Sequence, residues 1–254
     1  MVTHVMERVT ERLTTLGMPY MSQSLGDWLE DESKHEERTL LESLDSLVDM
    51  EWTNRQERQS RTRLKLSGMP QHKSLEDFDI QWPKGGLTEK RFRELCSLSW
   101  LERRENLVLM GPSGLGKTHL LLGLGYKACT QGVSVYYTSC IDLLDAMRKA
   151  RDARNLKRKL AWIRKPGLLL IDEVGYENMA EGEANLFFQI VNARYETASI
   201  VLTTNRAFSG WGELMGDDAV ATATIDRLLH HSITVNLKGN SYRMKGRLMA
   251  GIED

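Results

Sequence analysis

Residues 107–118 read LVLMGPSGLGKT, an apolar run followed by a glycine-rich loop that ends in Lys117 and Thr118. The next residues, 120–124, read LLLGL, so the loop joins a predicted strand to a predicted helix. In this context glycines let backbone N–H groups converge on phosphate oxygens, and the helix N-terminus adds the positive end of its dipole. The sequence therefore predicts a site for the phosphates of ATP. Its residues are Gly111, Pro112, Ser113, Gly114, Leu115, Gly116, Lys117, Thr118 and His119.

A second apolar run supplies the carboxylates that such a site needs. Residues 168–173 read LLLIDE, a predicted strand that ends in Asp172 and Glu173. Asp172 and Thr118 are expected to hold Mg²⁺, Lys117 to reach the β- and γ-phosphates, and Glu173 to act as general base on the attacking water. Together the two motifs predict an ATPase with ATP and Mg²⁺ as cofactors.

Apolar runs of strand length alternate with helical patterns from residue 106 onward. The predicted strands are 106–110, 133–138, 167–172, 199–204 and 232–237. Alternation of this kind predicts an α/β fold, a parallel five-stranded sheet flanked by helices. The run 133–138 separates the loop strand from the acidic strand in the chain, and with Glu173 this resembles the P-loop ATPases that have an additional strand and a catalytic glutamate.

The first 68 residues predict a separate, small all-helical domain. Apolar residues from Leu40 to Trp52 recur at spacings of three and four, and Ser67-Gly68-Met69-Pro70 then interrupts the helical pattern. The predicted domains are therefore 1–68 and 69–254. The basic end of the first domain, residues 55–65, is either a solvated helix face or a phosphate-contacting surface. Its role is left open between assembly, DNA contacts and partner contacts.

Two further residues are predicted to complete the catalytic site. Asn205 follows the strand 199–204, where its amide would orient the attacking water; the alternative is an asparagine that caps a turn. Arg227 precedes the last strand and would stabilise charge on the γ-phosphate from a neighbouring subunit. The alternative for Arg227 is an ion pair with Asp226 or Asp218. A finger arginine implies that the active form is an ATP-dependent homo-oligomer.

Residues 148–165 are the most basic stretch, with nine lysines and arginines against the single acid Asp152. They precede the acidic strand, where ring-forming ATPases project helices toward a central channel. We expect this stretch to contact the phosphates of duplex DNA without reading base sequence. The alternatives are a solvated face and an ion-pair partner for the helical domain. The residues predicted to bind DNA are Arg148, Lys149, Arg151, Arg154, Lys157, Arg158 and Lys159.

Composition sets limits on the class of protein. With 34 Lys and Arg against 35 Asp and Glu in 254 residues, the chain is not uniformly basic, although a local basic patch remains compatible with nucleic-acid binding. Its three cysteines have neither zinc-site spacing nor disulfide density, so buried thiols in a reducing compartment are expected. No apolar run has the length of a signal peptide or membrane span, which predicts a cytoplasmic protein without membrane contacts.

Taken together, the motifs resemble the IstB-like transposition helper ATPases, AAA+ proteins related to the DnaC helicase loaders and the DnaA initiator. The segments that carry the resemblance are 111–120, 171–176, Arg194-Tyr195-Glu196, 203–205, Asp226-Arg227-Leu228 with His230-His231, and 239–243. The resemblance implies a bacterial ATPase that oligomerises on duplex DNA, deforms it and delivers it to a partner transposase. Only 17 residues follow Leu237, so no C-terminal helical lid is expected. Arg243 is left open between nucleotide, DNA and its own domain.

Two other functions remain open at this point. One is a helicase loader whose N-terminal helices hold a replicative helicase. The other is a nucleotide-dependent switch with negligible turnover. The segment 239–243 and the Asp-Arg-Leu-His run favour the transposition relatives.

Overall fold

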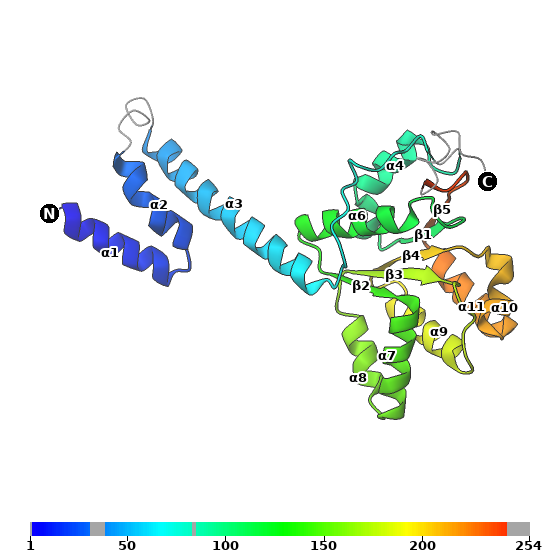
Figure 1. The fold of residues 1–254 in the computed structure, drawn as a ribbon. Helices are drawn as coiled ribbons and strands as arrows, with labels where there is room; N and C mark the ends of the chain where they lie inside the picture. Colours follow the sequence, from blue (N-terminus) through cyan, green and yellow to red (C-terminus); the bar gives the residue numbers. More distant parts are fainter. Residues whose placement is uncertain (1, 31–38, 83–84, 243–254) are drawn as a thin grey trace. The chain divides into compact units, whose positions relative to one another are not determined.

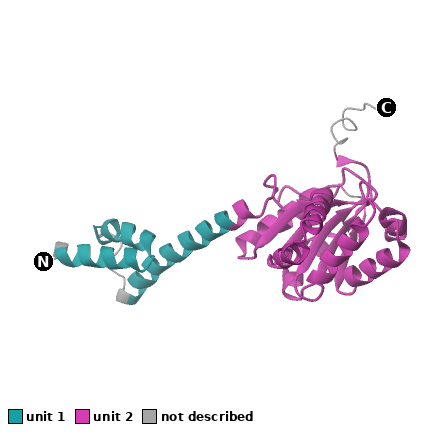
Figure 2. Ribbon diagram, turned by 90° about the horizontal axis from the view of Figure 1, so that it is seen from below, with its two compact units in different colours: residues 1–62 teal, residues 63–254 magenta. Residues whose placement is uncertain are grey.

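The computed structural model describes residues 2–30, 39–82 and 85–242. The chain divides into two compact units, residues 1–62 and 63–254 (Figure 2). This division falls inside helix α3 (Leu40–Leu66), shortly before the boundary predicted at residue 68. The assignment of separate roles to the two predicted domains stays a prediction.

The first unit consists of α1 (Val2–Thr15), α2 (Pro19–Glu30) and most of α3. Met21, Leu25 and Leu47 form its small core. The buried carboxylate of Glu51 on α3 accepts hydrogen bonds from the backbone N–H groups of Tyr20 and Met21, at 2.9 and 3.1 Å. These groups belong to the first turn of α2 and have no partner within that helix, so Glu51 caps α2 and joins it to α3.

The second unit contains a five-stranded sheet in the order β2-β3-β4-β1-β5, with every pair parallel (Figure 1). The strands are β1 (Asn106–Met110), β2 (Val135–Ser139), β3 (Leu168–Val174), β4 (Ser199–Thr204) and β5 (Ser232–Asn236). The predicted fold class is therefore confirmed. The bounds of β1 and β4 are as predicted, whereas β2 begins two residues later and β3 ends two residues later than the apolar pattern indicated.

Helices cover both faces of this sheet. Alternate residues of β1 show the two layers, because Leu107 and Leu109 pack in the core beneath α4 (Glu89–Cys96) and α6 (Lys117–Thr130), while Val108 packs in the core on the other face. That second layer contains α7 (Cys140–Asp152), α8 (Leu156–Ile163), α9 (Glu183–Arg194), α10 (Trp211–Met215) and α11 (Asp218–Leu229). Short helices α5 (Ser99–Glu102) and η2 (Phe208–Gly210) complete the unit. Strands buried on both faces read as continuous apolar runs, which is why the sequence pattern located them.

Arg194 is a buried residue that fixes the start of β4. Its guanidinium donates hydrogen bonds to the carbonyls of Ile163, Pro166 and Ser199 at 2.8, 3.0 and 2.8 Å. Burial lowers the pKa of Arg194 to about 10, which leaves the side chain charged at neutral pH. One side chain thus joins the end of α8, the loop before β3 and the first residue of β4.

Three remaining expectations concern the cysteines, a membrane span and the C-terminal residues. Cys129 and Cys140 are buried as predicted, whereas Cys96 is partly exposed. Among the described residues, no helix combines the length and apolar character needed to cross a membrane. Residues 243–254 lie outside the described part of the chain, so the absence of a helical lid and the role of Arg243 stay predictions.

Candidate nucleotide-binding site

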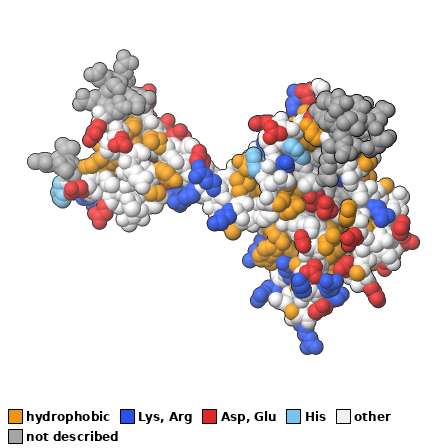
Figure 3. All heavy atoms as spheres, viewed as in Figure 1, with side chains coloured by type: hydrophobic (Ala, Val, Ile, Leu, Met, Phe, Trp, Pro, Cys, Tyr) orange, Lys and Arg blue, Asp and Glu red, His pale blue; other side chains and the backbone are white. Residues whose placement is uncertain are grey.

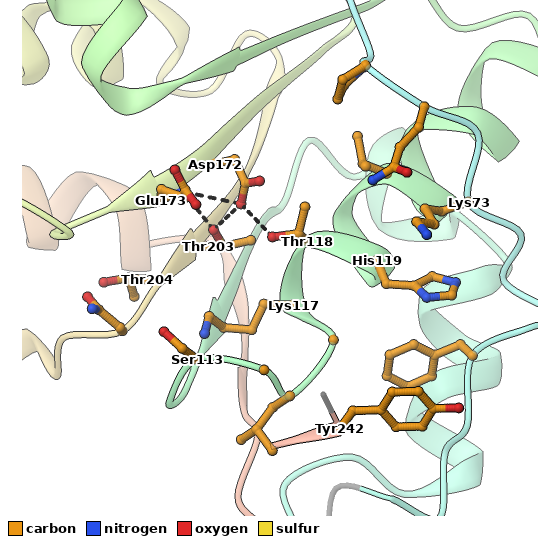
Figure 4. A pocket seen from close by; sticks show the side chains of 18 of the residues that line it. Lys73, Ser113, Lys117, Thr118, His119, Asp172, Glu173, Thr203, Thr204 and Tyr242 are labelled. Carbon is orange, nitrogen blue, oxygen red and sulfur yellow. Dashed lines mark hydrogen bonds between the residues drawn. The ribbon is translucent and has the colours of Figure 1, made fainter. Parts of the chain in front are cut away.

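A cleft of about 980 Å³ opens at the carboxyl ends of β1, β3 and β4 (Figure 4). Parallel α/β sheets bind ligands at this edge, because loops that follow neighbouring strands meet there. Most of the predicted catalytic and phosphate-binding residues line the cleft, namely Ser113, Gly114, Leu115, Gly116, Lys117, Thr118, His119, Asp172, Glu173 and Asn205. Arg227 and the predicted DNA-binding residues are not among its lining residues.

The loop between β1 and α6 requires glycine for two separate reasons. Gly114 and Gly116 have φ angles of 81° and 85°, a conformation that side chains disfavour. A Cβ atom on Gly116 would also lie 2.8 Å from Cε2 of Phe78, and one on Gly114 would overlap Ser241. Leu115 points into the core and is only 2% exposed, so in this loop it can offer a ligand only its backbone.

Lys117, the first residue of α6, folds back over this loop. Its Nζ atom donates hydrogen bonds to the carbonyl oxygens of Gly111 and Pro112, at 2.6 and 2.7 Å. The ammonium group therefore sits at the mouth of the glycine loop, where phosphate oxygens can compete with these two carbonyls for its protons. Gly111 and Pro112 contribute to the site through this contact.

Asp172 is the centre of a hydrogen-bond network built from three strands and a helix. Its bonds with Thr118 and Thr203 are drawn in Figure 4. The residue is 3% exposed. Its Oδ1 accepts from the hydroxyls of Thr118 and Thr203, at 3.2 and 2.5 Å, and its Oδ2 accepts from the hydroxyl of Tyr137 at 3.4 Å. Thr118 and Asp172 thus bring a hydroxyl and a carboxylate together, the hard oxygen donors that Mg²⁺ prefers.

Glu173 reaches the cleft because β3 contains a bulge. Ile171 pairs with Leu202 but Val174 pairs with Thr204, so β3 has one residue more than β4 across this interval. Glu173 has a φ of 62°, and its N–H donates to Thr203 Oγ1 at 2.9 Å. Without the bulge, residues 172 and 173 would point to opposite faces of the sheet. With it, Asp172 is buried and Glu173 is exposed beside it in the cleft.

Sequence reasoning missed Thr203 and Tyr137. Burial, and then the negative charge of Asp172, raise the pKa of Tyr137 to about 12, so its hydroxyl stays protonated and donates to Asp172. Thr203 was visible only as part of the Thr-Thr-Asn run at the end of a predicted strand. Its hydroxyl becomes significant because β4 is the strand that pairs with β3, which the sequence does not state.

Aromatic residues form the wall of the cleft beyond the glycine loop. Phe78 and His119 meet edge to face at 5.6 Å between ring centroids, and His119 Nε2 lies 2.6 Å from the carbonyl oxygen of Ser74. Tyr242 packs edge to face against Trp82 at 5.5 Å, and its backbone N–H donates to the carbonyl of Gly114 at 2.7 Å. The segments before α4 and after β5 therefore both line the cleft. His119 belongs to the predicted phosphate site, whereas no sequence signal singled out Phe78, Trp82 and Tyr242.

Asn205 is exposed and lines the cleft. The turn after β4 is capped by the preceding residue, since Thr204 Oγ1 accepts a hydrogen bond from the N–H of Arg206 at 3.1 Å. A turn-capping role for Asn205 is thus already filled. This favours the alternative in which its amide faces a ligand.

Arg227 lies on α11 and stacks on an aromatic ring. Its guanidinium carbon is 4.5 Å from the ring centroid of Phe188 on α9. Within the described residues it forms no ion pair with Asp226 or Asp218, so the local explanation for this arginine lacks support. Arg227 does not line the cleft of its own chain.

The predicted DNA-binding residues separate into two groups on α7 and α8. Arg148 and Lys149 pair with Asp145 at 2.7 and 2.6 Å, and Arg151 pairs with Asp152 at 3.1 Å. The pairings with Lys149 and Arg148 lower the pKa of Asp145, chiefly through the hydrogen bond from Lys149. Arg148 also lies 3.7 Å from Glu183, the first residue of α9. The ion-pair partners of this first group therefore lie on α7 and α9 of the second unit.

The second group lies around the turn between α7 and α8. Arg154, Lys157 and Arg158 are exposed and form no ion pair with the described residues. Lys159 lies 4.6 Å from the ring centroid of Trp162. Basic side chains are prominent on this projecting end of the second unit (Figure 3). The turn therefore presents positive charge that no acidic side chain in the described part of the chain pairs with.

Comparisons with known proteins agree with this architecture. The family described as IstB-like ATP binding protein matches residues 11–250. The chain is 42% identical over 240 residues to an ATP-binding protein of insertion sequence IS21 from Pseudomonas aeruginosa, covering 94% of this chain and 90% of that one. It is 40% identical over 239 residues to an ATP-binding protein of insertion sequence IS5376 from Geobacillus stearothermophilus, covering 94% of each.

Solved structures extend the comparison to the fold. AMPPCP-bound DnaA from Aquifex aeolicus superposes with a TM-score of 0.52 at 25% identity, over 71% of this chain and 56% of that one. DnaI superposes with a TM-score of 0.56 at 19% identity, over 67% of this chain and 95% of that one, which shows the fold alone. The chain belongs to the IstB-like ATP-binding proteins of IS21-type insertion sequences, and its second unit is an AAA+ domain.

Proposed function

We propose that this ATP-binding protein hydrolyses ATP. In this reaction Asp172 and Glu173 have different roles. The observation that carries the proposal is the bulge in β3, which places a buried, hydrogen-bonded carboxylate beside an exposed one in the same cleft. Asp172 and Thr118 hold Mg²⁺, which neutralises charge on the phosphates. Glu173 accepts a proton from the attacking water, Asn205 orients that water, and Lys117 binds the β- and γ-phosphates.

We further propose that the site is completed between chains. Among the described residues, those that line the cleft include Lys73 and Lys117 but no arginine. Phosphoryl transfer places negative charge on the γ-phosphate oxygens, and an arginine from a neighbour commonly stabilises it. Arg227, stacked on Phe188 outside its own cleft, supplies this group when chains assemble in the presence of ATP.

The assembled protein binds and deforms duplex DNA through the turn between α7 and α8. Support comes from the uncompensated charges of Arg154, Lys157 and Arg158, which suit phosphates and carry no base-reading geometry. Bending a short site costs about 1 to 6 kcal/mol, which contacts repeated over several chains can offset. Because the relatives at 42% and 40% identity are named for insertion sequences, we propose a transposase, and not a helicase, as the protein to which the DNA is delivered.

The Glu173→Gln variant tests the hydrolytic core of this proposal. We expect steady-state phosphate release to fall about 10²- to 10⁴-fold, because the general base is lost, while binding of a fluorescent ATP analogue is retained. Glu177→Gln is the matched control, since Glu177 is an exposed glutamate four residues further along the same segment that does not line the cleft. Phosphate release that is equal in wild type and Glu173→Gln, or absent from both, would contradict the proposal and leave the protein as a nucleotide-dependent switch.

The DNA part of the proposal needs its own measurement. Sedimentation of Glu173→Gln with ATP, with and without a duplex of arbitrary sequence, should show a larger assembly on DNA than in its absence. Adding the proposed partner transposase should then increase strand transfer into that duplex. A protein that sediments as a monomer under both conditions would overturn the assembly model.

A further inference from the structure

Two sequence motifs meet at the end of the sheet opposite the nucleotide cleft. The nucleotide site uses neither of them. Tyr195 and Glu196 lie just before β4, and His230 and His231 lie just before β5. Both strands pair in parallel with β1, so their amino ends share one edge of the sheet, whereas the cleft lies at the carboxyl ends. The residues at this edge therefore form a location separate from the nucleotide site.

Three of these side chains can reach a common point. Glu196, His230 and His231 each offer one ligand atom, and these atoms all lie within 4.8 Å of one another. The two imidazole rings are 4.2 Å apart between centroids, at an angle of 67°. All three residues are exposed, so a solute ion reaches them without any opening of the fold.

The backbone that carries these ligands is held by long-range contacts. Arg104 donates to the carbonyl of Glu196 at 3.0 Å, and the N–H of Asn106 donates to the carbonyl of His231 at 2.8 Å. Arg194, with its three carbonyl partners, fixes the residue just before the Tyr195-Glu196 turn. Both ligand-bearing segments are thus attached to the start of β1 or to the preceding loop, which limits the reorganisation needed on binding.

The hydroxyl of Tyr195 lies 3.0 Å from Nδ1 of His230. When Nδ1–H donates to this oxygen, the lone pair of His230 is at Nε2, the nitrogen that remains for an ion. Histidines that bind metals commonly donate their second ring N–H to a neighbouring oxygen, which fixes the tautomer and the ring orientation. Tyr195 is placed to do this for His230.

We propose that Glu196, His230 and His231 form a binding site for a divalent transition-metal ion, with Zn²⁺ as the expected occupant, supported by Tyr195. Two imidazoles and one carboxylate are a ligand set that Zn²⁺ accepts, while Mg²⁺ and Ca²⁺ require mainly oxygen ligands. Three protein ligands leave one tetrahedral position for water or for a group from another molecule. The site does not depend on ATP hydrolysis, so it stands or falls independently of the proposed function.

Metal titration of the full-length protein, freed of any histidine tag, tests this site directly. Zn²⁺ affinity is measured by competition with a chromogenic chelator, and Co²⁺ provides a visible absorption spectrum that reports nitrogen and oxygen coordination. We expect one tightly bound ion per chain in the wild type. The variants His231→Ala and Glu196→Gln should each bind at least about tenfold more weakly, and Tyr195→Phe, which keeps all three ligands, should also weaken binding measurably.

Two control variants separate this site from other histidines and from the cleft. His4→Ala removes an exposed histidine that lies 3.9 Å from Glu7, and it should leave Zn²⁺ binding unchanged. Lys117→Ala disables the nucleotide site and should also bind Zn²⁺ as the wild type does. Circular dichroism confirms that each variant is folded. Equal Zn²⁺ affinity in wild type and His231→Ala, or a Co²⁺ spectrum that neither His231→Ala nor Glu196→Gln changes, would overturn the proposal.

Discussion

The nucleotide cleft and the turn between α7 and α8 hold their charged side chains in different ways. In the cleft, Asp172 is 3% exposed and accepts hydrogen bonds from residues of α6, β2 and β4. Around the turn, Arg154, Lys157 and Arg158 are exposed. The shortest ion pairs of Arg148 and Arg151 are with acids within four positions, although Arg148 also lies 3.7 Å from Glu183. In the cleft, contacts between distant parts of the chain fix the charged group. At the turn, exposed basic side chains are presented by two neighbouring helices.

This difference separates two kinds of chemistry. Transfer of a phosphoryl group depends on groups placed within a fraction of an ångström, since misplacement raises the barrier directly. Contact with a phosphate backbone depends mainly on the number of cations that it meets. We therefore expect single substitutions to be severe in the cleft and graded at the turn, and the following variants test that expectation.

The largest effect on ATP turnover is expected from Arg227. This residue lies neither in the cleft of its own chain nor at the turn between α7 and α8. Arg227→Ala should lower ATP turnover about 10³-fold, because the γ-phosphate loses its compensating charge, with ATP affinity little changed. Mixing it with Lys117→Ala should restore part of the turnover, since the second variant can donate an intact Arg227. Wild-type turnover per chain that does not vary with protein concentration would show that each cleft works alone.

A smaller loss is expected from Thr203, whose hydroxyl bonds the carboxylate of Asp172 and the backbone N–H of Glu173. Thr203→Val removes the hydroxyl that donates to Asp172 and accepts from Glu173 N–H, so turnover should fall about 10- to 100-fold. Loss of these two hydrogen bonds should also lower the free energy of unfolding by about 1 to 3 kcal/mol, while Glu173 N–H keeps its contact with Asp172 Oδ1 at 3.2 Å. Thr203→Ser keeps the hydroxyl and should stay close to wild type in both assays. Equal turnover in the two variants would mean that the network is not needed for catalysis.

The smallest and most graded effect is expected at the turn. Replacing Arg154, Lys157 and Arg158 together by glutamine should lower the salt dependence of DNA binding by roughly three phosphate contacts, with ATP turnover in the absence of DNA unchanged. The matched triple variant of Arg148, Lys149 and Arg151 removes the same charge from positions that already have acidic partners, so its effect should be smaller. If DNA affinity depended on salt concentration in the same way in both triple variants, the proposal that the ion-paired cations contribute less to DNA binding would be wrong.

The sequence located most of the cleft because its signals are local. A strand followed by a glycine loop and a helix is contiguous in the chain, and so is the strand that ends in Asp172 and Glu173. The basic stretch was also visible, but the count of charges from residue 148 onward omitted Asp145, one helical turn before it. Neutralisation inside a helix follows spacings of three and four, so a count over a fixed window overestimated the free charge.

The sequence by itself determined the residue types at the phosphate loop, the parallel α/β fold and the positions of the strands, because backbone conformation and apolar periodicity are set by neighbours in the chain. Only the tertiary structure decided which strands adjoin, and hence that Thr203 supports Asp172, that a bulge turns Glu173 into the cleft, and that Glu196 meets His230 and His231. The physical reason is that contacts between strands distant in the chain follow from the sheet order β2-β3-β4-β1-β5, which minimises the free energy of the whole core and leaves no local trace in any one segment.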